Sequence, residues 1–103
     1  MSFPKPERFP LADQAISLRS KALGHPARLN ILRQLADGQA RCLSELAPGI
    51  PLSQATISGH LRILRNAGFI WVEERGLYNY YALNRVGVEE FQLVVGGYLS
   101  SIA

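Results

Sequence analysis

The spacing of the apolar residues changes at Gly68, and that change limits the folds the chain can adopt. Before Gly68 the apolar residues recur at intervals of three and four, the spacing of one face of an α-helix. After it come two short segments rich in aromatic and branched residues, 69–73 and 77–83, with Arg75-Gly76 between them. Two such segments, joined where a glycine can adopt a positive φ, predict a β-hairpin.

Four helices are predicted before this hairpin and one after it. Gly24 closes the first helix, Pro26 suits the first position of the second, and Asp37-Gly38 stops the second. Ser53 and Asn84 are N-cap residues for the fourth and the last helix. The apolar faces carry, in chain order, Leu11, Ala15, Leu18 and Ala22; Ile31, Leu32, Leu35 and Ala36; Leu43, Leu46 and Ala47; Ile57, Leu61 and Leu64; Val88, Phe91, Val95, Tyr98 and Ile102. The order α-α-α-α-β-β-α, mainly α with a small hairpin, predicts a winged helix-turn-helix.

The length and the composition fit a single small domain. The chain has 103 residues, 48% of them apolar, which is enough for one core. Pro4, Pro6 and Pro10 make residues 1–10 an expected mobile arm, and residues 11–103 are the expected winged helix-turn-helix domain. Only 18% of the residues are charged, which leaves apolar surface and favours self-association. The net charge of +3 is compatible with a nucleic-acid partner.

The sequence also predicts a compartment. Cys42 is the only cysteine, which excludes an internal disulfide framework and fits a reducing cytoplasm. Residues 1–10 lack the apolar segment of a secretory signal, and no apolar stretch is long enough to span a bilayer. We therefore expect a cytoplasmic protein with no membrane partner.

The helix predicted over 53–67 has an outer face without acidic residues. No Asp or Glu occurs between Glu45 and Glu73, and a carboxylate there would repel a phosphate backbone. The outward residues are small or polar: Gln54, Ala55, Ser58, Gly59, Arg62, Arg65 and Asn66. Gln54 can pair with an adenine edge, Thr56 and Ser58 offer hydroxyl groups, and Arg62 and Arg65 are assigned to phosphates. The alternative is a solvated helix that has few acids by chance.

The hairpin allows two interpretations. Arg75 near its tip can enter a minor groove or contact a phosphate, whereas Glu73 and Glu74 favour a cross-strand ion pair that only stiffens the hairpin. Tyr78, Tyr80 and Tyr81 are mainly structural by their alternation.

These segments resemble the ArsR/SmtB-type bacterial repressors. The similarity lies in Lys21-Ala-Leu-Gly-His-Pro-Ala-Arg-Leu-Asn-Ile-Leu32, in Leu43-Ser-Glu-Leu-Ala47 with Leu52-Ser-Gln-Ala-Thr-Ile-Ser-Gly-His-Leu-Arg-Ile-Leu-Arg-Asn-Ala-Gly68, and in residues 76–83. The resemblance implies a homodimeric repressor that binds a two-fold symmetric DNA operator and releases it when it senses an effector. It implies DNA contacts at Gln54, Thr56, Ser58, His60 and Arg62, while Gly59 stands where a bulkier polar residue is common. The expected DNA-binding residues are Ser53, Gln54, Thr56, Ser58, Gly59, His60, Arg62, Arg65 and Arg75.

The effector is not identified by the sequence. Many members of this family bind metal through a Cys-x-Cys pair, which here reads Cys42-Leu43-Ser44, and the last helix has Glu89 and Glu90 but no histidine. No metal site and no cofactor are therefore predicted. Cys42 is expected to be a small core residue, although a lone sensing thiol stays open. His25 is expected to form a hydrogen bond at a helix end, and His60 to contact a phosphate rather than only to pack.

The first and last helices are expected to form a dimer. Their apolar faces lie at the two ends of the chain, and pairing two copies about a two-fold axis would bury both faces. The expected interface residues are Leu11, Leu18, Phe91, Tyr98 and Ile102. The alternative is that both helices pack within one protomer. For function, the alternative is a winged helix that binds another protein; no enzyme is expected, because no set of nucleophile, base and orienting residue is recognisable.

Overall fold

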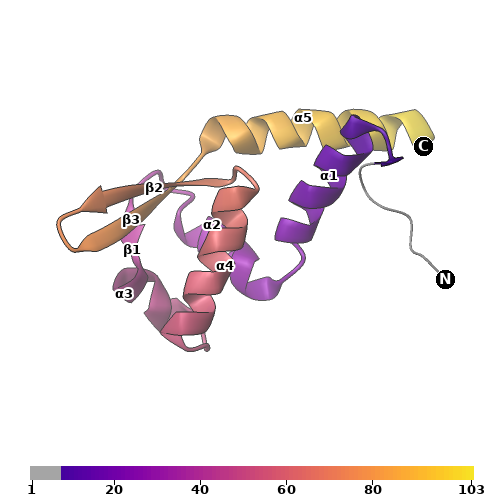
Figure 1. Cartoon of the computed structure of the whole chain (residues 1–103). Coiled ribbons are helices and arrows are strands. Elements are labelled where there is room, and N and C mark those ends of the chain that lie inside the picture. The colour runs from indigo at the N-terminus through magenta and orange to yellow at the C-terminus, as the bar shows by residue number, and fades with distance from the viewer. Residues whose placement is uncertain (1–7) are drawn as a thin grey trace.

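The computed structural model describes residues 8–103 and shows a winged helix-turn-helix (Figure 1). In chain order the elements are α1 (Leu11–Ala22), α2 (Pro26–Gln34), β1 (Arg41–Cys42), α3 (Leu43–Leu46), the 3-10 turn η2 (Ala47–Gly49), α4 (Gln54–Asn66), β2 (Ile70–Arg75), β3 (Tyr78–Leu83) and α5 (Arg85–Ile102). The predicted order of helices and hairpin is confirmed, with β1 and η2 added. Most of the predicted arm, residues 1–7, lies outside the described part of the chain.

Three helices start at the residues that the sequence predicts, because a side chain satisfies an unpaired backbone N–H there. Nδ1 of His25 accepts a hydrogen bond from Ala27 N–H at 3.0 Å, so the predicted helix-end role of His25 is confirmed. Ser53 Oγ accepts from the backbone N–H of Thr56 at 3.2 Å. Asn84 Oδ1 accepts from Gly87 N–H at 3.1 Å.

The sheet has three antiparallel strands in the order β1-β3-β2. β1 was not expected; it pairs Arg41 with Tyr81 and Cys42 with Tyr80. The turn between β2 and β3 lies one residue later than predicted, at Gly76-Leu77, since Arg75 pairs with Tyr78. Gly76 has a φ of 62°, as the first central residue of a type II′ turn requires.

The core lies between α2, α3, α4 and the base of the hairpin. Its fully buried large side chains are Ile31, Leu35, Leu46, Ile57, Leu61, Leu64 and Ile70. Two expectations are corrected here. Ala36 is exposed, because α2 ends at Gln34. Phe91, grouped above with the dimer residues, is 8% exposed and packs edge-on against Phe69, with the ring centroids 5.5 Å apart.

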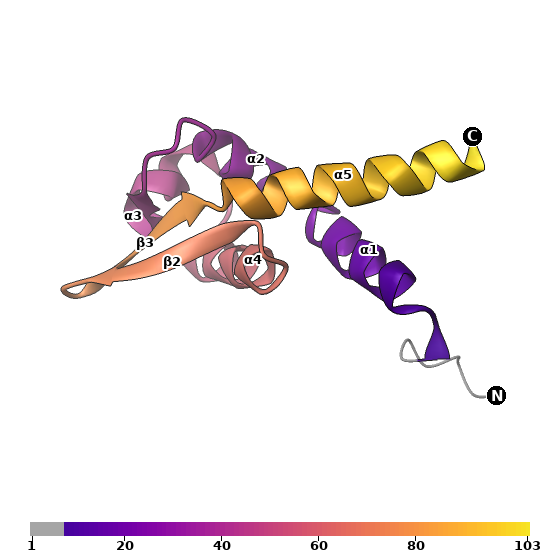
Figure 2. The same cartoon turned by 90° about the horizontal axis from the view of Figure 1, so that it is seen from above.

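The hairpin and the free end of α5 point in opposite directions (Figure 2). Seen from above, β2 and β3 project from one side of the core, while α5 runs past the core on the other side, with α1 near it. The two surfaces are therefore separated by the body of the protein. Within residues 8–103, no helix has the length and apolar character needed to cross a bilayer.

Candidate nucleic-acid interface

α4 presents one face to the core and the other to solvent. Ile57, Leu61 and Leu64 form the buried face, as predicted. Of the expected DNA-binding residues, five are exposed on α4 or at its start and three are half-buried. The exposed residues are Ser53, Gln54, Thr56, Arg62 and Arg65, and the half-buried ones are Ser58, Gly59 and His60.

The exposed face of α4 carries uncompensated positive charge. Within residues 8–103, neither Arg62 nor Arg65 makes an ion pair or a side-chain hydrogen bond. No carboxylate is present in the sequence between Glu45 and Glu73. Both guanidinium groups are therefore available to phosphate oxygens.

The two hydroxyl groups at the start of α4 are bonded to each other. Ser53 Oγ lies 2.9 Å from Thr56 Oγ1, and it also caps the helix. This pair fixes the first turn of α4. A hydroxyl oxygen has further hydrogen-bonding capacity, so the pair can also meet a DNA strand.

The side chains at the centre of the exposed face of α4 are small. No atom lies within 4 Å of the position that a Cβ on Gly59 would take, so the glycine opens onto free space. Ala55, one turn earlier, is exposed as well. With small side chains at this point, the helix backbone can come close to a flat surface such as the base edges of a major groove.

A hollow of about 330 Å³ separates the start of α4 from the hairpin. Sequence reasoning missed it, because its lining comes from three distant segments. The lining residues are Cys42, Leu43, Ser44, Gln54, Ser58, Leu77, Tyr78, Asn79 and Tyr81. Its polar side chains carry hydroxyl and amide groups but neither a carboxylate nor a cation. We call this depression the wing hollow.

His60 faces α2 from the flank of α4. Its ring lies 4.3 Å from that of His25, centroid to centroid, and its Nδ1 is buried without a hydrogen-bond partner among the described residues. Burial, followed by the charges of His25 and Arg28, lowers the pKa of His60 below its usual 6.5. His60 is therefore neutral at pH 7.

Arg75 of the wing is held by its own strand. Its Nη2 lies 3.0 Å from Glu73 Oε2, and its guanidinium carbon lies 4.6 Å from the centre of the Tyr80 ring. The expected cross-strand ion pair is thus corrected, because the pair joins two residues of β2, and the cross-strand partner is an aromatic ring. The carboxylate of Glu73 raises the pKa of Arg75.

Cys42 is buried, which confirms the prediction of a small core residue. Its N–H donates to Glu45 Oε1 at 3.0 Å, and Sγ lies 3.2 Å from Ser44 Oγ. These contacts start α3, and the hydrogen bond from the Cys42 backbone lowers the pKa of Glu45.

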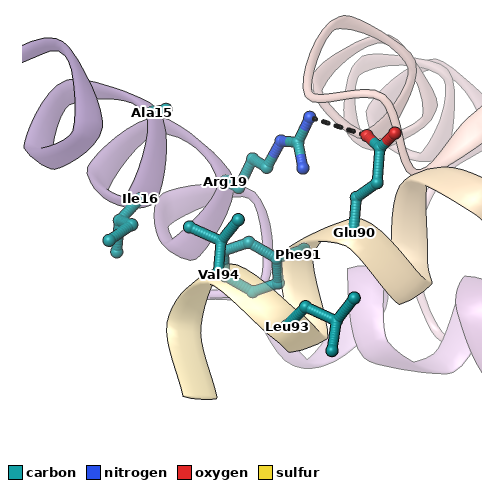
Figure 3. Close-up of a pocket in the computed structure, with 7 residues that line it drawn as sticks. All are labelled: Ala15, Ile16, Arg19, Glu90, Phe91, Leu93 and Val94. Carbon is teal, nitrogen blue, oxygen red and sulfur yellow. Dashed lines mark ion pairs between the residues drawn. The ribbon is translucent and has the colours of Figure 1, made fainter. Parts of the chain in front are cut away.

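α1 and α5 meet at a groove of about 290 Å³ (Figure 3). Arg19 reaches across it to Glu90, with 3.9 Å between Nη2 and Oε2, over a floor that includes Phe91. Outside this groove both helices keep exposed apolar side chains: Leu11 is 81% exposed and Leu18 is 60% exposed. Tyr98, Leu99 and Ile102 of α5 are exposed too, and so are Leu93 and Val94, which line the groove. Sequence reasoning did not single out Leu93, Val94 or Leu99.

Known proteins share this architecture and sequence. Residues 25–71 match the family model described as bacterial regulatory protein, arsR family. An uncharacterized HTH-type transcriptional regulator of Methanocaldococcus jannaschii is 39% identical over 61 residues, which are 59% of this chain and 68% of that protein. The arsenical resistance operon repressor of Bacillus subtilis is 36% identical over 64 residues, 62% of this chain and 61% of the repressor. This chain therefore spans about three fifths of that repressor's length.

A solved structure agrees over nearly the whole chain. It is the homodimeric winged helix-turn-helix DNA-binding domain of a possible ArsR-family transcriptional regulator from Mycobacterium bovis. It is 26% identical, has a TM-score of 0.69, and the similarity covers 95% of this chain and 90% of that one. The chain belongs to the ArsR family of winged helix-turn-helix transcriptional regulators, which bind DNA.

Proposed function

We propose that this chain is a homodimeric repressor that places two copies of α4 in successive major grooves of a two-fold symmetric operator. The observation that supports this most is the exposed face of α4, which has two arginines without a partner among residues 8–103, small residues at its centre and no carboxylate. Such a face repels no phosphate and lets the backbone approach the base edges. An effector then releases the DNA; no described residue is assigned to it. This role places the protein in the cytoplasm, with the chromosome.

The dimer follows from the apolar residues that one protomer leaves in water. The residues are Leu11 and Leu18 of α1 and Tyr98 and Ile102 of α5. α1 and the free end of α5 lie at the end of the molecule opposite to the wing (Figure 2). Pairing two copies there buries these residues and leaves both α4 helices free. The Mycobacterium bovis neighbour is described as homodimeric, which supports a dimer for this chain.

The test is a selection of duplexes from a random pool, followed by binding measurements at increasing salt. A two-fold symmetric consensus is expected, with half-sites about one helical turn apart or a multiple of it. If each protomer neutralises around four phosphates, the slope of log K against log salt is about −7. An affinity that does not change with salt between roughly 50 and 200 mM contradicts the proposal.

Repression is tested in the cell with a reporter gene behind the selected operator. Expression rises when the regulator's gene is deleted if the protein represses, and falls if it activates. The second candidate, a winged helix that docks another protein, gains support only if no duplex is retained at low salt.

A further inference from the structure

Leu77 is the most exposed large apolar residue in the described part of the chain, at 97%. It lies in the two-residue turn between β2 and β3, directly after Gly76. Turns of this kind favour small polar residues, because their side chains stand in water. The hairpin itself does not need a leucine here, since the positive φ falls on Gly76.

The proposed dimer does not cover Leu77 either. The tip of the wing lies at the opposite end of the molecule from α1 and from the free end of α5 (Figures 1 and 2). A second copy seated on those helices therefore leaves the leucine exposed. A partner that covers Leu77 would therefore contact the side of the molecule that carries the wing and α4.

The wing hollow connects the leucine to that surface. Leu77, Tyr78 and Asn79 line one side of it, and Gln54 and Ser58 of α4 line another. The hollow lies between the start of α4 and the hairpin. With α4 in a major groove, the DNA strand at the edge of this groove would therefore lie over the hollow, and the minor groove on the other side of that strand would face the hairpin. The neutral hydroxyl and amide groups of the hollow are donors of the kind that bind phosphate and sugar oxygens.

Charge does not draw the wing to DNA. Residues 70–83 contain Glu73, Glu74 and Arg75, one cation against two anions, which is a net charge of −1. The cation already pairs with Glu73 at 3.0 Å and lies over the Tyr80 ring. What the tip offers to a duplex is an apolar side chain, and leucine is one of the residues that proteins insert into minor grooves as a wedge between base steps.

We propose that Leu77 enters the minor groove beside the half-site read by α4 and acts as an apolar wedge that bends the operator. The inference rests on the proposed DNA-binding function, and it adds a residue that selects flanking sequence. Pyrimidine–purine steps unstack most easily, so the wedge favours TA or CA steps at that position.

The experiment uses a duplex of about 30 base pairs selected by the wild-type protein and labelled with a fluorophore at each end. Energy transfer reports the bend, and anisotropy reports the affinity. Leu77→Ala is expected to straighten the DNA and to weaken binding about tenfold, because apolar area is no longer buried. The salt slope stays unchanged, since no charge is removed. A fresh selection with this variant loses the TA or CA preference in the flank.

Two further variants separate a wedge from a general wing contact. Leu77→Met is expected to restore the bend, whereas Leu77→Arg gains affinity through phosphates, steepens the salt slope and leaves the DNA straight. Leu29→Ala removes the same side-chain atoms from an exposed position on α2 and is expected to change nothing.

The inference is overturned if Leu77→Ala bends the duplex as the wild type does and binds within about twofold of it. A wild-type protein that binds its selected duplex without bending it overturns the wedge alone. A wild-type protein that retains no duplex at low salt overturns the proposed function, and the wedge with it.

Discussion

The imidazole rings of His25 and His60 lie 4.3 Å apart, centroid to centroid, and are tilted by 38° to each other. His25 caps α2, and His60 belongs to α4, so this contact fixes the start of one helix against the helix that carries the proposed DNA surface. A proton on His60 would lie in a partly buried site close to His25 and Arg28. We therefore expect the contact between the two helices to weaken in acid.

We predict that acidification destabilises the fold through His60. Burial and the neighbouring charges lower the pKa of His60 in the folded protein below the usual 6.5, while the unfolded chain keeps about that value. As the pH falls through 6.5, the unfolded state takes up the proton first, and the free energy of unfolding decreases. The decrease ends below the folded pKa. Urea unfolding at a series of pH values measures it.

The control for this prediction is His60→Gln, which cannot be protonated. It is expected to flatten the pH dependence above pH 5, because the carboxylates with lowered pKa, Asp37 and Glu45, lose their stabilising effect only in more acidic solution. A titration midpoint for His60 at or above 6.5 by NMR contradicts the prediction.

Arg62→Ala is expected to weaken binding to all duplexes alike, about tenfold at low salt, and to flatten the salt slope by about one unit. The reason is that a phosphate contact carries charge but no base information. Arg33→Ala, which removes an exposed arginine from α2, is the matched control for net charge. Equal effects of the two substitutions would show that total charge, not the α4 face, governs affinity.

Gln54→Ala is expected to relax the preference at one base pair of each half-site and to leave the salt slope unchanged. The amide of glutamine can pair with an adenine edge, and such a pair discriminates by about 1–3 kcal/mol. Selection with the variant, compared base by base with the wild type, measures this. A consensus that stays the same at every position shows that Gln54 does not read a base.

The helix starts that position the candidate site could be predicted from the sequence, because their signals are local. The caps at His25, Ser53 and Asn84 act over two or three residues, and so each helix start is visible in the sequence. β1 carries no such signal. Its two residues become a strand only by pairing with Tyr80 and Tyr81, which are far away in the chain.

The same distinction explains the errors at α5. One apolar stripe predicts that Phe91 is turned inward or toward a partner, and spacing alone cannot choose between them. Phe91 is in the core because Phe69 meets it at the base of the hairpin. Val94 and Leu99 lie beside that stripe, Leu93 lies on the opposite side of the helix, and all three are exposed. The contact of His25 with His60 also depends on how the helices pack, so no sequence pattern announces it.

Leu18→Asp is expected to produce a monomer. Leu18 is 60% exposed on the α1 surface that the proposed dimer buries, and a carboxylate there would be desolvated without a partner. Light scattering after gel filtration measures the mass, and the DNA affinity should fall with it. Leu29→Asp, at an exposed leucine on α2, is expected to stay dimeric. A wild-type protein that is already monomeric at micromolar concentration contradicts the dimer.

Gly59→Ala is expected to stabilise the protein and to weaken DNA binding. An alanine methyl group at this position meets no atom within 4 Å, so it costs no strain, and alanine is favoured over glycine inside a helix by about 0.8–1 kcal/mol. The melting temperature should rise by about 4–8 °C. The same methyl group stands at the centre of the α4 face and keeps the backbone farther from the base edges.

The reverse substitution one turn earlier, Ala55→Gly, provides the matched comparison. It removes one methyl group from the same exposed face, lowers stability by a similar amount and does not hinder the approach to DNA. Thermal unfolding and anisotropy on the selected operator give both quantities for each variant. If Gly59→Ala binds as tightly as the wild type while its melting temperature rises, then α4 does not approach the bases at this point, and the missing side chain has no part in recognition.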